Sequence, residues 1–255
     1  MINFACLQKF CQFVLGTTAG LVLLVSSCKT SAITTSKQNE PNLSMDTSWN
    51  TLRFEPDSFS SLVNLETKYG TLKIELFFGT GAHRENFLKL AKEGFYDDLL
   101  FHRIIKNFMV QGGDPKSRHA KKNMRLGGGG NGYEIDAEIN TDFFHVRGAL
   151  AAARQSDEVN PEKKSSGCQF YIVHGNKVRD EQLDEVERMH NMAYSPKQRV
   201  LYQQLGGTPQ LDMEYTVFGR VYDGFHLIDS IANMNTDNYD RPLDDLKMTI
   251  QIVRE

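Results

Sequence analysis

Strict alternation of apolar and polar residues is the feature that most limits how this chain can fold. Val63–Thr67 and Leu72–Leu76 each alternate with a period of two, and the short stretch 68–70 between them ends in glycine, which is the pattern of a β-hairpin. Near the C-terminus, Leu246–Ile252 alternates in the same way. A period of two places successive side chains on opposite faces of a strand. The sequence therefore predicts a mainly β protein.

Two widely spaced segments change to a helical period. From His83 to Gly94 the apolar residues gather on one side of a helix, and Gly94 is a suitable terminator. Leu227–Met234 repeats its apolar residues at helical spacing. Many short strands with two helices favour a closed antiparallel barrel, but periodicity alone does not separate a barrel from a sandwich.

Residues 101–115 combine one cation with apolar and amide side chains and then end in a tight turn. Arg103 is the cation, Phe108 and Met109 are the apolar pair, Gln111 carries the amide, and a Gly-Gly-Asp-Pro turn follows. The pattern F-H-R, then F-M, then Q-G-G-D resembles the signature of the cyclophilin family of peptidyl-prolyl isomerases. The resemblance implies an enzyme that catalyses cis/trans exchange at X-Pro bonds and needs no cofactor and no metal.

The residues of this segment suit the chemistry of an X-Pro bond. Rotation about such a bond meets a barrier of roughly 18–20 kcal/mol, because the amide nitrogen shares its lone pair with the carbonyl. An apolar slot for the proline ring and a donor that binds the rotated state better than the planar one lower this barrier. Arg103 can be the donor, since a guanidinium offers a rigid fork of N–H groups. Phe108 and Met109 can form the slot, and Gln111 can hold the substrate backbone.

A second segment resembles another part of the family's pocket. Gly148–Arg154 is similar to G-x-L-S-M-A-N, whose small residues leave room for a substrate backbone beside Ala153. Arg154 departs from the usual asparagine. The departure predicts either a change in how the residue before proline is held or an extension of the positive field near Arg103.

A third segment, Ser165–Ile172, resembles N-G-S-Q-F-F-I. In a strand Gln169 and Tyr171 share a face, so both can line the groove while Cys168 and Phe170 turn inward. Tyr171 stands where the family usually has phenylalanine, and it adds a hydroxyl to the ring.

A fourth segment, Pro209–Val221, resembles W-L-D-G-K-H-V-V-F-G-K-V. Leu211 keeps the apolar wall of the pocket. Gln210 replaces the tryptophan typical of cyclosporin-sensitive members, and Tyr215 replaces a histidine, which implies isomerase activity with low cyclosporin affinity. Met213 replaces a glycine and implies an altered turn.

The resemblance covers residues 61–253 with one interruption, and it implies an eight-stranded closed antiparallel barrel capped by two helices. It gives Arg103 the catalytic role. A Pro-peptide binding or chaperone module with weak turnover is the alternative, because the rim around residues 210–215 is altered. A structural role for His102 stays open beside its place in the binding set. The expected substrate-binding residues are His102, Phe108, Met109, Gln111, Ala153, Gln169, Tyr171, Leu211 and Tyr215.

Residues 176–207 form the interruption and predict an inserted helical hairpin. Leu183–Ala193 has helical spacing, Ser195–Gln198 has the form of a capped helix start, and a Gly-Gly pair at 206–207 ends the second helix. The insertion is either a surface hairpin or a partner-binding arm. Its position before the pocket wall predicts a role in substrate selection.

Residues 1–27 predict a bacterial lipoprotein signal peptide. No charged residue lies between Phe10 and Cys28, and the apolar run Phe13–Val25 follows Lys9. The sequence V-S-S-C that ends at Cys28 resembles the bacterial lipobox, which implies lipidation of Cys28. An uncleaved membrane helix is the alternative, since the run approaches the ~17–25 residues of a span. Both interpretations predict a membrane-anchored, extracytoplasmic protein on the periplasmic or cell-surface side.

Residues 28–57 predict a polar tether, and residues 58–255 predict one folded domain. The formal net charge of −3 gives no sign of a nucleic-acid partner. Cys168 is the only cysteine after Cys28, so the processed chain offers neither an intrachain disulfide in its domain nor a zinc site. We expect a monomer whose partners are proline-containing polypeptides and, through the lipid, a membrane.

The glycine-rich stretch Gly127–Gly132 formally satisfies the dinucleotide motif G-x-G-x-x-G. The following residues, Tyr133–Ile139, alternate like a strand instead of opening a helix, so the structural context of that motif is missing. We interpret the stretch as a flexible loop.

Overall fold

The computed structural model describes residues 54–255. The predictions for the signal peptide at 1–27, for Cys28 and for most of the tether at 28–57 lie outside the described residues. Within the described range, every helix falls short of the length and apolarity that a membrane span needs.

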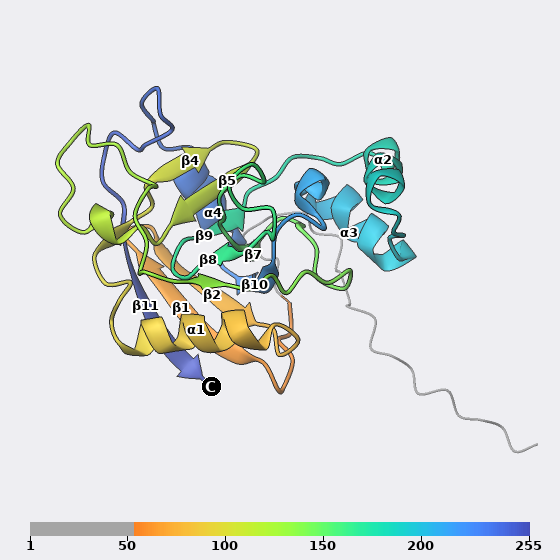
Figure 1. Cartoon of the computed structure of the whole chain (residues 1–255), viewed down its shortest axis with the longest axis horizontal. Helices are drawn as coiled ribbons and strands as arrows, with labels where there is room; N and C mark the ends of the chain where they lie inside the picture. The colour runs from red at the N-terminus through yellow and green to blue at the C-terminus, as the bar shows by residue number, and fades with distance from the viewer. Residues whose placement is uncertain (1–53) are drawn as a thin grey trace, which may run out of the picture. The chain divides into compact units, whose positions relative to one another are not determined.

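Antiparallel strands form the framework of the described domain, as the alternation predicts (Figure 1). The first two strands are the predicted hairpin, and the last strand is the predicted C-terminal one. The strands are β1 (Ser61–Thr67), β2 (Gly70–Leu76), β3 (Leu99–Leu100), β4 (Arg103–Ile105), β5 (Met109–Gly112), β6 (Glu134–Ile135), β7 (Ala149–Ala152), β8 (Ser165–Ser166), β9 (Phe170–Val173), β10 (Val217–Asp223) and β11 (Lys247–Arg254).

The main sheet corrects the expected strand count. In residues 54–255 it has nine strands in the order β3-β11-β1-β2-β10-β7-β9-β5-β4, and β6 and β8 form a separate pair. The two end strands, β3 and β4, are consecutive in the chain. Phe101 between them bonds the Leu246 carbonyl on the β11 side, and His102 bonds the Gln111 carbonyl on the β5 side. Phe101 and His102 therefore connect the two ends of the curled sheet. The sheet is not a closed barrel of eight hydrogen-bonded strands.

Both predicted capping helices contribute to the interior of the curled sheet. Helix α1 (Gly81–Lys92) and helix α4 (Phe225–Ala232) bury Phe87 and Phe225 in the same hydrophobic core as the strands. Gly94 follows α1 with a φ of 67°, which is the left-handed geometry expected of its terminator. The Glu138 carboxylate accepts hydrogen bonds from backbone N–H groups at the start of α1, where an acidic group stabilises a helix.

The insertion forms the predicted helical hairpin from α2 (Asp180–His190) and α3 (Pro196–Leu205). Ser195 caps α3, and its hydroxyl accepts from the Gln198 N–H while the Gln198 side chain accepts from the Ser195 N–H. The hairpin has its own small hydrophobic cluster with residues of the loop before β7. Two short 3-10 turns, η1 (Pro115–Ser117) and η2 (Pro209–Leu211), complete the elements.

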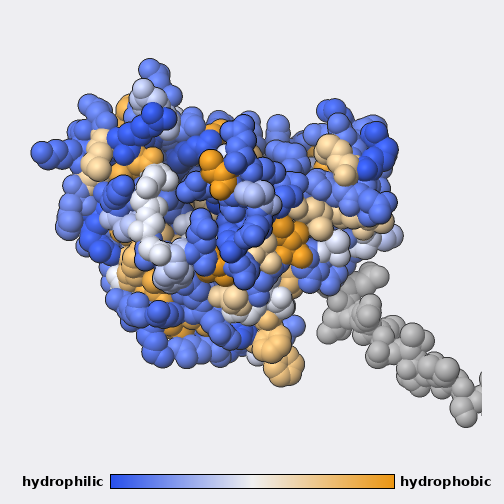
Figure 2. Space-filling view, in the orientation of Figure 1, coloured by the Kyte–Doolittle hydropathy of each residue, from blue (hydrophilic) through white to orange (hydrophobic). Residues whose placement is uncertain are grey.

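A second hydrophobic cluster lies on the outer face of the sheet. On β9, Phe170 and Ile172 belong to the interior core, whereas Tyr171 and Val173 belong to the outer cluster, as the alternation of a strand requires. On the face shown in Figure 2, hydrophobic side chains appear as separate patches in a largely hydrophilic surface. The outer cluster is where the predicted pocket residues gather.

Candidate active site

Three predicted residues lie side by side on neighbouring strands. Arg103 on β4 is the register partner of Gln111 on β5, and Gln111 is the partner of Tyr171 on β9. Phe170 and Ile172 enter the interior core, so the row with Tyr171 faces outward. Segments that are distant in the sequence thus bring a cation, an amide and an aromatic ring onto one surface.

A cavity of about 150 Å³ opens on this row. It contains every predicted catalytic and substrate-binding residue except His102 and Gln169, and it adds Arg154. We call this cavity the slot. Its lining residues are Arg103, Phe108, Met109, Gln111, Ala153, Arg154, Tyr171, Leu211 and Tyr215.

Arg103 is the cation with free hydrogen-bond donors in the slot. Its side chain is 43% exposed, and its Nε lies 3.4 Å from Oδ2 of Asp240. No other described residue accepts a hydrogen bond from its guanidinium, so its terminal N–H groups can donate to a ligand. Asp240 also accepts the Ile104 N–H through its carbonyl at 2.8 Å. Asp240 was not among the predicted site residues, and no local motif marks it.

Two glutamines orient each other beside Arg103. The Gln111 side-chain amide donates to Oε1 of Gln169 at 3.0 Å. Gln169 in turn donates to the carbonyls of Gly127 and Gly129 at 2.9 and 2.6 Å. These hydrogen bonds leave Oε1 of Gln111 without a donor among residues 54–255. This oxygen can therefore accept an N–H from a substrate backbone. Gln169 is therefore a support for Gln111 and does not line the slot itself.

The glycine-rich stretch is a wall of the adjoining groove. Gly128, Gly129 and Gly130 line a cavity of about 500 Å³ that shares Gln111 and Ala153 with the slot. The cavities can together hold an extended chain on one side of a bound proline. The sequence analysis treated this stretch only as a loop, although a glycine run also signals close approach of backbone to another group.

Asp114 holds this wall in place. Its carboxylate is fully buried and accepts the N–H groups of Gly127 at 2.6 Å and Gly129 at 3.2 Å. A Cβ atom at Gly129 would lie 1.9 Å from Oδ1 of Asp114. Glycine at 129 is therefore required by this contact. The motif that supplies Arg103 and Gln111 also supplies the anchor of the groove wall.

His102 lies beneath this surface. It is only 3% exposed, and it lines a neighbouring cavity of about 430 Å³ together with Arg103 and Gln111. Neither ring nitrogen has a partner in good hydrogen-bond geometry among the described residues. Burial lowers the pKa of His102 to about 4, against smaller opposing effects of the Asp114 carboxylate and of the nearby Leu100 backbone. The ring is thus neutral near pH 7.

Arg154 does not extend the positive field around Arg103. Its side chain is 4% exposed and donates to the carbonyl and the carboxylate of Glu214 at 2.8 and 3.1 Å, and it also pairs with Asp157. Its guanidinium stacks over the Tyr215 ring at 4.5 Å. Arg154 therefore has two carboxylate partners and supports the Tyr215 wall of the slot.

The remaining wall comes from η2 and the turn that follows it. Leu211 lines the slot, whereas Gln210 is exposed and lies outside it. Met213, which stands where the resembled family has glycine, has a φ of 62°. This is the left-handed conformation that glycine adopts at no steric cost. Met213 therefore takes the backbone conformation that suits glycine at this turn.

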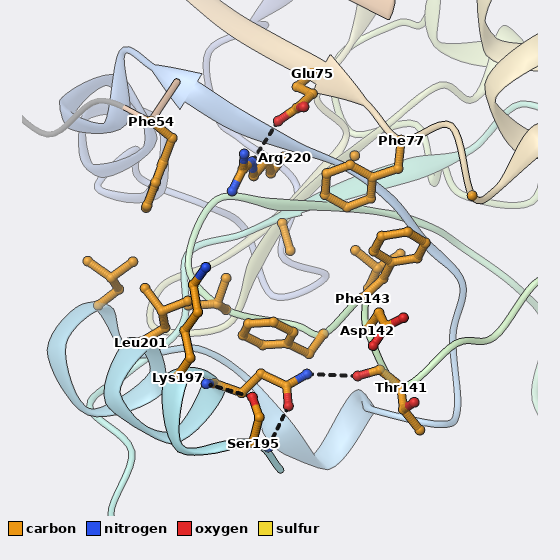
Figure 3. Close-up of a pocket in the computed structure, with 18 of the residues that line it drawn as sticks. Phe54, Glu75, Phe77, Thr141, Asp142, Phe143, Ser195, Lys197, Leu201 and Arg220 are labelled. Atoms are coloured by element: carbon orange, nitrogen blue, oxygen red, sulfur yellow. Dashed lines mark hydrogen bonds and ion pairs between the residues drawn. The ribbon is translucent and has the colours of Figure 1, made fainter. Parts of the chain in front are cut away.

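A larger cavity of about 740 Å³ lies away from these residues, between α3 and strands β2 and β10 (Figure 3). Phe77 and Phe143 lie on its wall, and their rings stack with centroids 4.5 Å apart. Arg220 in this cavity is bound to Glu75 at 2.7 Å. In the described part of the chain, no group of His, Cys, Asp or Glu side chains could hold a metal ion.

Comparisons with known proteins agree with the geometry. The family model described as cyclophilin type peptidyl-prolyl cis-trans isomerase/CLD matches residues 62–253. Proteins of Staphylococcus saprophyticus and Staphylococcus aureus that are named peptidyl-prolyl cis-trans isomerases are 35% and 32% identical over 66% and 72% of this chain. The matches cover 79% and 87% of those two proteins.

A protein of Streptococcus pyogenes named as a bifunctional phosphatase/peptidyl-prolyl cis-trans isomerase is 35% identical over 72% of this chain, and the match spans 37% of its length. Among solved structures, a cyclophilin type peptidyl-prolyl cis-trans isomerase of Cryptosporidium parvum has a TM-score of 0.58 and 28% identity. That similarity covers 77% of this chain and 99% of the other. A second structure of the same protein, solved in the presence of the dipeptide Ala-Pro, has a TM-score of 0.56 and covers 76% and 99%.

Proposed function

Because the chain belongs to the cyclophilin-type peptidyl-prolyl cis-trans isomerases, we propose that it accelerates X-Pro rotation in unfolded or flexible polypeptides outside the cytoplasm and so assists their folding. The observation that carries the proposal is the slot, where the free donors of Arg103 share a cavity with the apolar side chains of Phe108, Met109 and Leu211. The Ala-Pro dipeptide present with the Cryptosporidium parvum relative supports a proline-containing ligand.

In the proposed mechanism the proline ring enters the slot, and Gln111 accepts an N–H from the substrate backbone. Rotation of the amide removes the resonance that keeps it planar and leaves a lone pair on the prolyl nitrogen. A terminal N–H of Arg103 then donates near this nitrogen or its preceding carbonyl. The hydrogen bond strengthens as the amide twists, so it lowers the barrier more than it tightens ground-state binding.

A prolyl isomerisation assay on a short Pro-containing peptide tests this mechanism. Arg103→Ala should lower kcat/KM by roughly 100-fold or more, as the loss of one preorganised donor does in other enzymes. Lys106→Ala is a matched control, since Lys106 is an exposed cation of the same β4–β5 hairpin that does not line the slot. Undiminished turnover in Arg103→Ala would contradict the mechanism.

A proline-peptide binding module with weak turnover is the second candidate. The altered rim of the slot favours it, because Arg154 and Tyr215, which replace the residues usual in the family, form part of the slot wall. Isothermal titration with the same peptide distinguishes the two functions. Binding without acceleration of exchange by the wild-type protein would establish the module.

The proposed location and anchor rest on the sequence of residues 1–28. The uncharged apolar run and the V-S-S-C sequence support lipidation at Cys28 and an extracytoplasmic membrane anchor on the periplasmic or cell-surface side. Mass analysis of the mature N-terminus tests this proposal. An unmodified Cys28 with an intact leader would refute it. We also propose a monomer, which size-exclusion chromatography of the domain checks.

A further inference from the structure

A buried carboxylate gathers four hydrogen bonds behind the slot. Asp212 directly follows the slot residue Leu211, and its side chain is 4% exposed. Its Oδ1 accepts the backbone N–H of His145 at 2.8 Å and the His145 ring Nδ1–H at 2.7 Å. Its Oδ2 accepts the hydroxyls of Tyr194 and Tyr202, each at 2.5 Å. A buried charge needs such partners to be tolerated.

The same carboxylate reaches the slot through His145. Nε2 of His145 lies 2.9 Å from the Tyr171 hydroxyl, and the two rings are nearly parallel with centroids 6.0 Å apart. Because Nδ1 faces the carboxylate of Asp212, Nδ1 is the nitrogen that carries the proton, and Nε2 faces the Tyr171 hydroxyl. The Tyr171 hydroxyl then donates to Nε2, and its ring is held where it lines the slot.

Two of the four donors come from the inserted hairpin. Tyr202 lies on α3, and Tyr194 directly precedes the cap of that helix. Both side chains are buried. The base of the hairpin is also joined to the segment that carries His145, because the Thr208 N–H donates to the His145 carbonyl at 2.9 Å. The insertion therefore contacts the slot wall through a continuous set of hydrogen bonds.

We propose that the inserted hairpin positions the proline slot through this network, so that Tyr194, Tyr202, Asp212 and His145 are positioning residues for Tyr171 and Leu211. We call these four residues the relay. The proposal rests on the proposed function, because it takes the slot as the place where the proline ring binds.

The relay explains two features that otherwise have no common cause. Tyr171 carries a hydroxyl that the slot surface does not need, and the relay gives it an acceptor. The hairpin buries two tyrosine hydroxyls that a purely surface hairpin would leave in water, and the relay gives them a carboxylate. Misplacement of a binding group by about 1 Å can cost on the order of 100-fold in rate, so holding the Tyr171 ring affects function.

A double-mutant cycle tests the relay. The hairpin change is Tyr194→Phe with Tyr202→Phe, the slot change is Tyr171→Phe, and a third protein carries all three substitutions. Each substitution keeps the ring and removes only a hydroxyl. We expect the hairpin change to raise KM for a short Pro-containing peptide by about tenfold, with a smaller change in kcat. Tyr171→Phe removes the hydrogen bond between Tyr171 and His145. In a protein that carries this substitution, the hairpin change should therefore not raise KM further.

Arg199→Gln is the matched control. Arg199 joins α2 to α3 through Asp180, Asp184 and Glu187, and it has no hydrogen bond to a relay side chain. The Glu187 carboxylate also accepts the Tyr194 backbone N–H, a bond that the substitution keeps. This variant loosens the hairpin surface but should keep the wild-type KM. A KM that rises as much in Arg199→Gln as in the hairpin variant would show that general loosening of the hairpin is the cause, and it would overturn the relay.

Additive effects of the hairpin and slot changes, or an unchanged KM in the hairpin variant, would also overturn the proposal. Urea unfolding of the same four proteins gives a readout that does not need turnover, and zero coupling between the two changes there would refute the relay as well. An inactive wild-type protein with clear coupling would instead contradict the proposed function and keep the relay. Should the paired hairpin change prevent folding, Tyr202→Phe alone takes its place, because Asp212 then keeps three donors.

Discussion

Acid should destabilise the domain through His102, and His102→Leu should remove this effect. The His102 side chain is 3% exposed, and neither ring nitrogen has a partner in good hydrogen-bond geometry among residues 54–255. Burial lowers its pKa from 6.5 to about 4. Leucine is an apolar residue of similar size, so the substitution removes the titrating group without leaving a buried polar atom.

The sign and size of the effect follow from the two pKa values. Between pH 6.5 and about 4 the unfolded chain binds a proton at residue 102 and the folded domain does not. The destabilisation caused by His102 is therefore absent well above pH 6.5 and grows as the pH falls toward 4. One pKa unit corresponds to about 1.4 kcal/mol, so His102 should cost about 2 kcal/mol at pH 5 and about 3 kcal/mol at pH 4.

Urea unfolding at pH 7.5 and pH 5.0 measures this cost. The wild-type protein should lose about 2 kcal/mol more between the two pH values than His102→Leu does. His83 and His174, whose pKa values burial also lowers, are present in both proteins, so their contributions cancel in the comparison. Equal losses in the two proteins would show that the folded domain protonates His102 as readily as the unfolded chain does, and would refute the reasoning.

Three further substitutions test the surroundings of the slot. Asp240→Ala should lower kcat/KM by up to about fivefold, since an exposed ion pair is worth at most about 1 kcal/mol, and added salt should shrink the difference between the two proteins. Arg154→Asn should lower the free energy of unfolding in urea by about 2 kcal/mol and raise KM, because Tyr215 loses its stacked guanidinium. Asp114→Asn should cost about 2 kcal/mol in the same unfolding assay, because an amide has one acceptor oxygen for the backbone N–H groups that the carboxylate binds; an unchanged midpoint would contradict this role.

Local sequence patterns predicted the elements that depend on near neighbours. The β1–β2 hairpin follows from alternation interrupted by a glycine turn, and the start of α3 follows from the capping pair Ser195 and Gln198. The pairing of Arg103 with Gln111 could also be predicted, because both residues lie in one short motif that folds back on itself as a hairpin. In each case the determining interactions span only a few residues.

Contacts between distant segments could not be predicted in this way. Asp240 is 137 residues from Arg103, and Asp212 is 67 residues from His145. No periodicity links such positions, since their approach depends on the sheet order and on the path of the insertion. The eight-strand count came from the family resemblance, and local periodicity could not have corrected it. Strands β3 and β4 have two and three residues, which is too short for alternation to mark them.

The hydroxyl of Tyr171 and the inserted hairpin are physically dependent on each other. The Tyr171 hydroxyl finds its buried acceptor at Nε2 of His145, and the Asp212 carboxylate fixes that acceptor by holding the proton on Nδ1. A buried carboxylate at Asp212 in turn needs donors for its second oxygen, and in the described chain these are the hydroxyls of Tyr194 and Tyr202. Removing the hairpin would leave that oxygen without a partner. The insertion is therefore part of the structure of the slot wall, and its deletion should weaken proline binding even for a peptide too short to touch it.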